Sequence, residues 1–537
     1  MANRNLKMAF PGPFFDKRAI ATHRNSIPIE KYNIMQAYDG HANNLIHMSQ
    51  GKVDIPLTRK VAPAYEDGVS SLAVRGAANP NPRYISNEIC KQDTSVPNSV
   101  GLSDMVWGWG QFIDHEIDLT STQSGEGAEV ANIIAPGDDP NLPNATIKFT
   151  RSIYEDGSNP RQQVNKISAY IDATNVYGSN CVRANELRMH DGSGKLKTQL
   201  SLNSEVILPD NTNLEMAHLD SQSVNDMLMA GDERANENHL LTAIHTLFVR
   251  EHNRQCDELV SRNSEWENND DKIFHEARMR CIAIMQAITY NEYLPKIIGV
   301  MPTYTGYKQT VNASIMNLFS TAAYRFGHSM LSADLLRKFN SGPDETVRLR
   351  DAFFNPAFLR TEGVDSFLAG AMNQVMQEID NHVIEDVRSF LFGPPGGDMM
   401  LDLAALNIQR GRDHGLPDYN TCRVACGLRK HFRFSDITSN VDLASKLSTV
   451  YNGKINTVDP WVGGLCEDHV AGSQVGEFLQ KVLRLQFVAL RDGDRFYYEN
   501  DPRITDEEKN TLSGTTLADV IRRNTNIDSV ADDVFMV

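Results

Sequence analysis

The stretch GLSDMVWGWGQFIDHEIDLT, residues 101–120, decides how the rest of the chain is interpreted. Its second half has the apolar spacing of a buried helix. Four polar side chains recur at i, i+3, i+4 and i+7 and therefore share one face of that helix: Gln111, Asp114, His115 and Asp118. A buried polar group without a partner costs on the order of 2–7 kcal/mol. The stripe therefore predicts either a hydrogen-bonded core network or a binding site.

Composition restricts the class of protein. The chain has 537 residues, 41% hydrophobic and 23% charged, which is ordinary for a globular protein. Its net charge of −17 argues against nucleic acid or an anionic membrane as a partner. No run of about 18 apolar residues occurs, so we expect no transmembrane segment. Seven cysteines without a CxxC pair disfavour a dense disulfide framework and a structural zinc site.

The periodicity of the chain predicts one large helical domain. Residues 1–35 lack a strong period and contain three prolines, so we expect an extended arm there and a single domain over 36–537. Strand signals are scarce. Helical spacing predicts helices over residues 238–262, 272–294, 311–333, 379–392, 399–412, 441–451 and 475–490. The predicted fold is mainly α, with long loops and little β structure.

Three further polar pairs occur at i, i+3: Arg234 and Glu237 at the start of the first long helix, and Arg325 and His328, and Asn407 and Arg410, within later helical segments. Each pair alone is typical of a surface salt bridge or a helix cap. Together with the first stripe they describe a site for a flat cofactor. Two histidines on separate helices could face it from opposite sides, and arginines could bind its carboxylates. An asparagine could orient the second histidine, as in a haem site between helices.

A polar loop at residues 166–180 carries oxygen side chains at alternate positions: Ser168, Asp172 and Thr174. Alternate oxygen ligands with backbone carbonyls between them can enclose a calcium ion. An ordinary polar turn is the alternative interpretation of the same pattern.

These motifs resemble those of the animal-type haem peroxidases, the peroxidase–cyclooxygenase superfamily. Peroxinectin-like and bacterial members are the most similar branches. The matching motifs span most of the chain in the family's order: YDGHANNL (38–45), WGQFIDHEID (109–118), YIDATNVYGS (170–179), HTLFVREHNR (245–254), YRFGHS (324–329), LNIQRGRDHGLPDYN (406–420), WVGGL (461–465) and LRDGDRFYYEN (490–500).

The resemblance implies a single haem-peroxidase domain and a peroxidase activity. Such an enzyme would reduce hydrogen peroxide and oxidise a halide such as bromide or iodide, thiocyanate, or a small aromatic donor such as a phenol. We expect a monomer that responds to oxidative stress, is secreted or extracellular, and binds no nucleic acid. No signal peptide is visible in residues 1–15.

The resemblance also assigns the iron-facing residues. His115 resembles the distal histidine, a general acid–base for hydrogen peroxide. Arg234 matches the distal arginine that stabilises developing negative charge, and Gln111 matches the glutamine that holds water or halide. His328 matches the proximal iron ligand, with Asn407 accepting a hydrogen bond from it.

The other residues that match the family's motifs would bind haem b and calcium. Asp114 and Glu237 match the carboxylates that form ester bonds to the haem, and Arg325 and Arg410 match residues that face its propionates. The implied calcium ligands are Ser168, Tyr170 through its carbonyl, Asp172, Thr174 and Glu116.

Two positions depart from the family pattern. Asn238 stands where one mammalian member has a methionine that bonds to haem, so chloride oxidation is less favoured than oxidation of easier donors. Glu116 stands where an aspartate is usual, which puts the calcium geometry in doubt. No Arg-Gly-Asp tripeptide occurs, so an adhesive role lacks motif support.

Three alternatives compete with this interpretation. A fatty-acid dioxygenase of the same superfamily would carry its radical-forming tyrosine three residues before the proximal histidine, where this chain has Arg325. Tyr324 lies one residue earlier, so on an α-helix we expect it to point away. A haem-free adhesion protein would not need the intact set of site residues. A zinc hydrolase would need an HExxH-like ligand set, which His115-Glu116 does not begin.

Overall fold

The computed structural model describes residues 35–76, 79–392 and 401–537. The extended arm expected at residues 1–35 lies almost entirely outside this part of the chain. Its boundary with the domain therefore stays a prediction.

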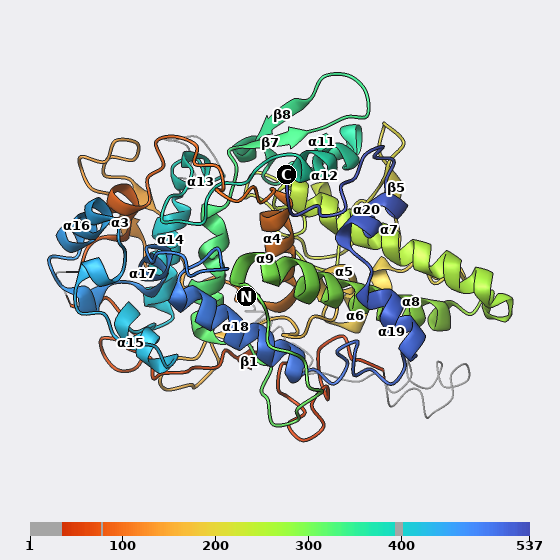
Figure 1. The fold of residues 1–537 in the computed structure, drawn as a ribbon, viewed down its shortest axis with the longest axis horizontal. Coiled ribbons are helices and arrows are strands. Elements are labelled where there is room, and N and C mark those ends of the chain that lie inside the picture. The colour runs from red at the N-terminus through yellow and green to blue at the C-terminus, as the bar shows by residue number, and fades with distance from the viewer. Residues whose placement is uncertain (1–34, 77–78, 393–400) are drawn as a thin grey trace, which may run out of the picture.

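Helices dominate the described chain, and α4 lies near the middle of the molecule (Figure 1). The α-helices are α3 (Pro82–Ile89), α4 (Met105–Ile117), α5 (Thr174–Tyr177), α6 (Cys181–Leu187), α7 (His239–Arg262), α8 (Asp270–Ile288), α9 (Leu294–Ile298), α10 (Leu349–Ala352), α11 (Pro356–Glu362), α12 (Asp365–Met372), α13 (Glu385–Arg388), α14 (Leu403–Asp413), α15 (Tyr419–Ala425), α16 (Val441–Val450), α17 (Pro460–Leu465), α18 (Glu477–Asp492), α19 (Asp506–Ser513) and α20 (Leu517–Asn524). The mainly α fold with long loops is confirmed.

The β structure consists of short antiparallel pairs. Strands β1 (Ile55–Pro56) and β4 (Val164–Asn165), β2 (Ile133–Ile134) and β3 (Thr146–Ile147), β5 (Gln199–Leu200) and β6 (Val206–Ile207), and β7 (Asp334–Arg337) and β8 (Glu345–Arg348) form these pairs. Such short pairs connect loops and contribute no layer to the fold.

Helix α4 is buried on nearly every side and packs closely against α7. At Gly108 an added Cβ would lie 2.8 Å from Leu240 Cδ2, so glycine permits this approach of the two helices. Nearby, the Trp109 ring lies 5.6 Å from the Phe248 ring of α7 and 5.5 Å from the Phe112 ring. This packing places the start of α7 beside the polar stripe of α4.

Distant parts of the chain are joined by the buried carboxylate of Asp494. It accepts hydrogen bonds from Asn43 Nδ2 at 2.7 Å, from Gln286 Nε2 of α8 at 3.2 Å and from the Phe496 N–H at 2.8 Å. Burial raises the pKa of Asp494 to about 7. Hydrogen bonds between segments so distant in sequence are consistent with one domain over the described residues.

Three expected helices, at 238–262, 441–451 and 475–490, are confirmed as α7, α16 and α18. The expected helix at 399–412 corresponds to α14, although residues 399 and 400 lie outside the described part. The expected helix at 272–294 corresponds to α8, which continues into a π-helical turn at Thr289–Tyr293.

The single helix expected at 311–333 is confirmed only in part, because the helical stretch covers residues 317–329. It is also not a regular α-helix, since it consists mainly of a π-helical turn, Phe319–Ala323, and a 3₁₀ helix, Tyr324–Ser329. The first part of the expected segment makes tertiary hydrogen bonds in place of helical ones, because the Met316 N–H donates to Gln486 Oε1 at 2.7 Å and the Asn317 N–H to the Thr58 carbonyl at 2.8 Å.

The helix expected at 379–392 is wrong, because only the single turn α13 forms there. The backbone just before it pairs with another segment. The Val383 N–H donates to the Cys90 carbonyl at 2.8 Å, and the Glu378 N–H donates to the Val96 carbonyl at 2.7 Å.

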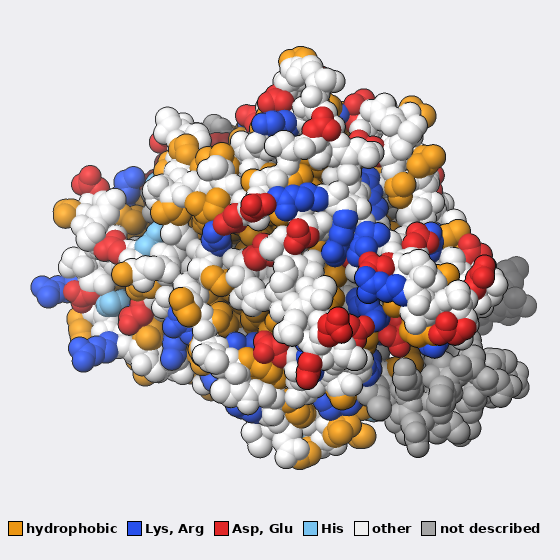
Figure 2. Space-filling model, turned by 45° about the vertical axis from the view of Figure 1, so that its right-hand side comes forward, with side chains coloured by type: hydrophobic (Ala, Val, Ile, Leu, Met, Phe, Trp, Pro, Cys, Tyr) orange, Lys and Arg blue, Asp and Glu red, His pale blue; other side chains and the backbone are white. Residues whose placement is uncertain are grey.

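The surface mixes charges of both signs, and Figure 2 shows acidic and basic side chains interspersed over one face. All seven cysteines are free, and six of them are buried. Within the described residues, none of the helices combines the length and apolarity needed to cross a membrane.

We expect Gly108→Ala to lower the free energy of unfolding by about 1–3 kcal/mol, because the new Cβ would crowd Leu240 and Ile244 of α7. Gly411→Ala in α14 is the matched control, since its Cβ would meet Leu416 Cδ1 at an ordinary 3.7 Å. Urea unfolding measures both. Equal midpoints for the two variants would contradict the proposed close packing.

Candidate active site

A cavity of about 320 Å³ lies between α4, the start of α7, the 3₁₀ helix Tyr324–Ser329 and α14. It brings together residues from segments that are more than two hundred positions apart. The expected site residues that line it are Gln111, Asp114, His115, Arg234, Glu237, Arg325 and His328. Apolar side chains such as Met330, Leu349 and Leu406 form the rest of its wall. The cavity therefore joins an apolar slot to a charged rim.

His115 lies in α4 with two carboxylates near its ring. Its Nδ1 is 3.6 Å from Asp232 Oδ1, and its Nε2 is 3.8 Å from Glu237 Oε2. Nδ1 is buried and makes no hydrogen bond. Burial, reinforced by the Arg234 guanidinium, holds the pKa of His115 well below its usual value. The imidazole is therefore neutral at neutral pH and can accept a proton.

Arg234 is held by a buried carboxylate that sequence reasoning missed. Its Nε and Nη2 donate to Asp232 at 2.9 and 2.8 Å. Its Nη1 donates to the Asp118 carbonyl at 3.0 Å, and Nη2 donates to the His115 carbonyl at 3.3 Å. Although burial acts in the opposite direction, the Arg234 guanidinium holds the pKa of Asp232 well below its usual value. The only sequence signal for Asp232 is an acidic residue two positions before Arg234.

Gln111 is held at both ends of its amide. Its Nε2 donates to Glu237 Oε1 at 3.1 Å, and its Oε1 accepts from Asn238 Nδ2 at 2.8 Å. Asn238 is also the N-cap of α7, because its Oδ1 accepts from the Leu241 N–H at 2.9 Å. Asn238, which stands where one mammalian family member has methionine, thus caps α7 and orients Gln111.

His328 meets Asn407 on the other side of the cavity. Asn407 Nδ2 lies 2.7 Å from His328 Nδ1, while Asn407 Oδ1 accepts from Arg325 Nη1 at 3.2 Å. The pairing of the two residues is as expected, but the amide presents its nitrogen to the histidine where an oxygen was expected. The Arg325 donor explains this orientation. Burial lowers the pKa of His328 to about 3.

The two carboxyl groups that line the cavity have similarly raised pKa values. Burial raises the pKa of both Asp114 and Glu237 to about 7. Asp118, whose role the sequence left open, has a buried Oδ1 without a hydrogen bond, and burial raises its pKa also. The cavity is therefore lined by two carboxyl groups that are costly to ionise, Asp114 and Glu237.

Arg410 does not line the cavity. Its Nη1 donates to the Thr150 carbonyl at 3.0 Å, to Ser152 Oγ at 2.9 Å and to Asp413 Oδ2 at 3.0 Å. Its guanidinium also lies over the Phe149 ring, 4.1 Å from the centroid. Of the two arginines expected at the propionates, the structure brings only Arg325 to the cavity.

Tyr324 lines the cavity, which corrects the expectation that it points away. The expectation assumed an α-helix, whereas Tyr324 begins a 3₁₀ helix directly after a π-helical turn. Its ring stacks on Phe319 at 4.8 Å, and its buried hydroxyl makes no hydrogen bond.

The expected calcium residues also lie together, in the loop before α5. Ser168 Oγ donates to Asp172 Oδ2 at 2.8 Å, and Thr174 Oγ1 donates to Asp172 Oδ1. Glu116 accepts from backbone N–H groups of the same loop. The Tyr170 hydroxyl donates to the Gln50 carbonyl at 2.9 Å.

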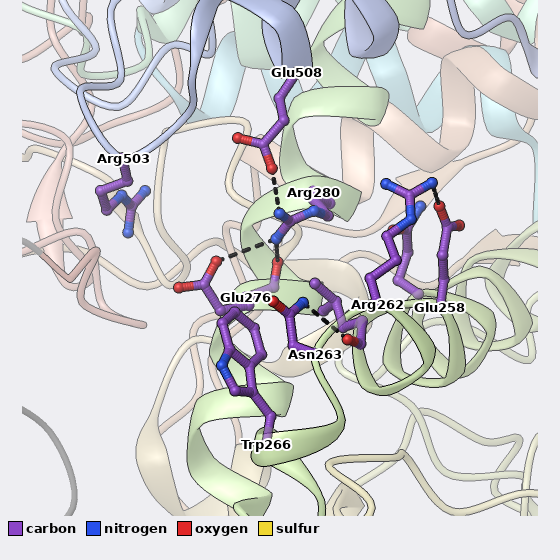
Figure 3. Close-up of a pocket in the computed structure, with 10 residues that line it drawn as sticks. Glu258, Arg262, Asn263, Trp266, Glu276, Arg280, Arg503 and Glu508 are labelled. Carbon is purple, nitrogen blue, oxygen red and sulfur yellow. Dashed lines mark hydrogen bonds and ion pairs between the residues drawn. The ribbon is translucent and has the colours of Figure 1, made fainter.

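A second hollow, of about 360 Å³, lies between α7, α8 and α19 (Figure 3). Its arginines are already paired. Arg280 contacts Glu276 at 3.1 Å and also Glu508, while Arg262 pairs with Glu258. No histidine or cysteine lines this hollow, so it offers no nucleophile or metal ligand comparable with the first cavity.

Comparison with known proteins places these residues in a family. A family model described as animal haem peroxidase matches residues 35–535. Peroxinectin A of Dictyostelium discoideum is 34% identical over 532 residues, which cover 95% of this chain and 97% of that protein. A peroxidasin homolog of Mus musculus is 34% identical over 559 residues, 94% of this chain but only 37% of that protein.

Solved structures show the same relationship. Peroxidase A from Dictyostelium discoideum has a TM-score of 0.86 and 32% identity, covering 94% of this chain and 99% of that one. A fatty acid alpha-dioxygenase of Arabidopsis thaliana has a TM-score of 0.79 at 19% identity, covering 95% of this chain and 84% of that one. The second likeness shows the shared fold alone.

We expect Asn238→Asp to separate the two roles of this residue. Aspartate keeps an oxygen for the Leu241 N–H but cannot donate to Gln111, so thermal unfolding should stay near wild type. Turnover of a small donor with hydrogen peroxide should fall about fivefold, the effect of one hydrogen bond of about 1 kcal/mol.

The control for this prediction is Asn238→Ala, which removes the helix cap as well and should also lose about 1 kcal/mol of stability. Unchanged turnover in a well-folded Asn238→Asp variant would show that Asn238 does not orient Gln111.

Proposed function

The chain belongs to the animal haem peroxidase family, and from this premise we propose that it is a haem-dependent peroxidase with its active site in the cavity between His115 and His328. The observation that carries the proposal is the pair of imidazoles that line one cavity from different elements, together with its apolar wall. Hydrogen peroxide is the oxidising substrate. The donors are small: bromide, iodide, thiocyanate or phenolic compounds.

The residues present fit a haem. The apolar wall suits a flat macrocycle, and Arg325 on the rim suits a propionate. Haem iron, when bound, supplies the redox chemistry that reduces peroxide and withdraws electrons from a donor. His328 is the proposed iron ligand. It can bind through Nε2 only when its Nδ1–H donates to Asn407, so the amide must then present Oδ1 to the ring.

On the distal side the protein's own residues handle the proton. Neutral His115 accepts a proton from hydrogen peroxide at Nε2 and returns it to the departing oxygen. Asp232 lies beside Nδ1 and favours the tautomer with its proton there. Arg234, fixed by Asp232, stabilises the negative charge that develops on the departing oxygen. Gln111, held at both amide ends, orients water or a halide.

The carboxyl groups of Asp114 and Glu237 are proposed to bond covalently to haem b as esters. Each ester would replace a C–H bond of a haem methyl group with a C–O bond, a two-electron oxidation in which one hydrogen peroxide is reduced to water. Both line the cavity, and both have raised pKa values, so each spends part of its time as the neutral acid near pH 7. The contribution of Arg410 to the propionates is then electrostatic, because it lies behind the wall and pairs with Asp413.

The calcium ion that the family resemblance implies fits the described residues less well than haem does. The oxygen atoms of Asp172 already accept from Ser168 and Thr174, and the carboxylate of Glu116 accepts from backbone N–H groups. We therefore derive no step of the reaction through calcium. We further propose a monomeric extracellular protein without nucleic-acid partners, in keeping with its net charge of −17.

A fatty-acid dioxygenase remains the second candidate, because Tyr324 lines the cavity. Oxygen uptake with a long-chain fatty acid in the presence of hydrogen peroxide tests it. We expect no uptake above the peroxidase background, and uptake that Tyr324→Phe abolishes would favour the dioxygenase.

His328→Ala should abolish haem retention, because the iron loses its protein ligand. The measurement is the Soret absorbance of purified protein, followed on addition of hydrogen peroxide. Wild-type protein without a Soret band would support the haem-free adhesion alternative. Normal turnover in His328→Ala would refute the proximal assignment.

Wild-type haem should resist extraction into acidified organic solvent because of the proposed ester bonds. The double variant Asp114→Asn, Glu237→Gln should release it, since an amide cannot form the ester. Each single variant serves as a control that reports one bond. Release of haem from the wild-type protein would show that neither ester forms.

A further inference from the structure

We infer that the carboxylate of Glu116 takes the place of a bridging calcium ion, so that this chain ties α4 to the loop of residues 168–175 through direct hydrogen bonds. The inference concerns how the site is held together. It rests on family membership, and the proposed haem chemistry does not enter it.

The hydrogen bonds of Glu116 carry the inference. Its Oε1 accepts from the Asp172 N–H at 2.7 Å and from the Thr174 N–H at 3.2 Å, and its Oε2 accepts from the Asn175 N–H at 2.9 Å. Glu116 is fully buried, with 0% of its surface exposed. Three backbone donors from one short loop thus converge on one carboxylate of α4.

These donors disfavour a cation at the same carboxylate. A calcium ion binds oxygen atoms and would lie against the positive ends of the N–H dipoles that Glu116 now satisfies. Each oxygen of the Glu116 carboxyl group already accepts at least one of these hydrogen bonds. The link between α4 and the loop is therefore already made by the side chain.

The length of the glutamate side chain explains the difference from the aspartate usual in the family. Aspartate is one methylene shorter, so from the same backbone position its carboxylate would stop short of the loop and leave a gap that an ion could bridge. The extra methylene of Glu116 closes that gap.

The second carboxyl group also has partners within the protein. Asp172 is fully buried, and its two oxygens accept from the hydroxyls of Ser168 and Thr174. Both oxygens of this side chain are therefore already occupied by hydrogen bonds from its own loop.

The hydrogen bonds of Glu116 are connected to the candidate active site through Asn175. The Asn175 carbonyl accepts from the Asp232 N–H at 3.1 Å, and its Nδ2 donates to the Phe112 carbonyl of α4 at 2.9 Å. Asp232 in turn holds Arg234 beside His115. Glu116 therefore helps to fix the positions of Asp232, Arg234 and His115 through this chain of hydrogen bonds.

The decisive experiment uses the purified wild-type holoprotein. Its calcium content is measured by mass spectrometry of the metal, and its thermal unfolding is compared in EGTA and in millimolar calcium chloride. We expect far less than one calcium ion per chain and the same unfolding temperature in both solutions. One tightly held ion per chain, or a fall of several degrees in EGTA, would overturn the inference.

A matched pair of variants tests the side chain itself, with both proteins in EGTA. Glu116→Asp should unfold several degrees below wild type, whereas the control Glu126→Asp, in an exposed loop, should not shift. An unshifted Glu116→Asp would overturn the inference. Should Glu116→Asp fail to fold, the wild-type calcium content and EGTA comparison still decide.

Discussion

The nearly complete burial of α4 is the constraint on which the rest of the structure depends. A helix surrounded by protein cannot leave its polar side chains to water, so each must find a partner in another segment. Gln111 forms hydrogen bonds with Glu237 and Asn238. Glu116 accepts hydrogen bonds from the segment that contains Asp172, and His115 lies beside Asp232. The architecture of the distal site follows from meeting these needs.

One consequence is that structural and chemical roles fall on the same side chains. Asn238 caps α7 and donates a hydrogen bond to Gln111 Oε1, so the start of that helix and the orientation of the Gln111 amide are set by one side chain. Asp232 anchors Arg234 and lies beside His115. Because these partners join α4 to the stretch from Asp232 to the start of α7, the geometry of the cavity depends on how those two segments pack.

The sequence predicted the cavity residues well where the signal was a polar residue in an apolar helix, as for His115 and His328. The prediction of helices failed where backbone N–H groups donate to partners outside the segment. The apolar spacing of 311–333 suits a helix, but only residues 317–329 are helical, and just before and at their start Met316 and Asn317 donate to Gln486 and Thr58 instead. Asp232 escaped notice because spacing rules do not apply within an irregular turn.

The sequence by itself determined the helical class, the polar stripe of α4 and the identity of the charged residues and histidines that line the cavity, because apolar periodicity and buried polar groups are local signals. Only the tertiary structure decided that Tyr324 faces the cavity, that Arg410 lies behind its wall and that Glu116 bonds to backbone N–H groups. Those outcomes depend on distances between segments remote in sequence, and side-chain spacing within one segment carries no information about them.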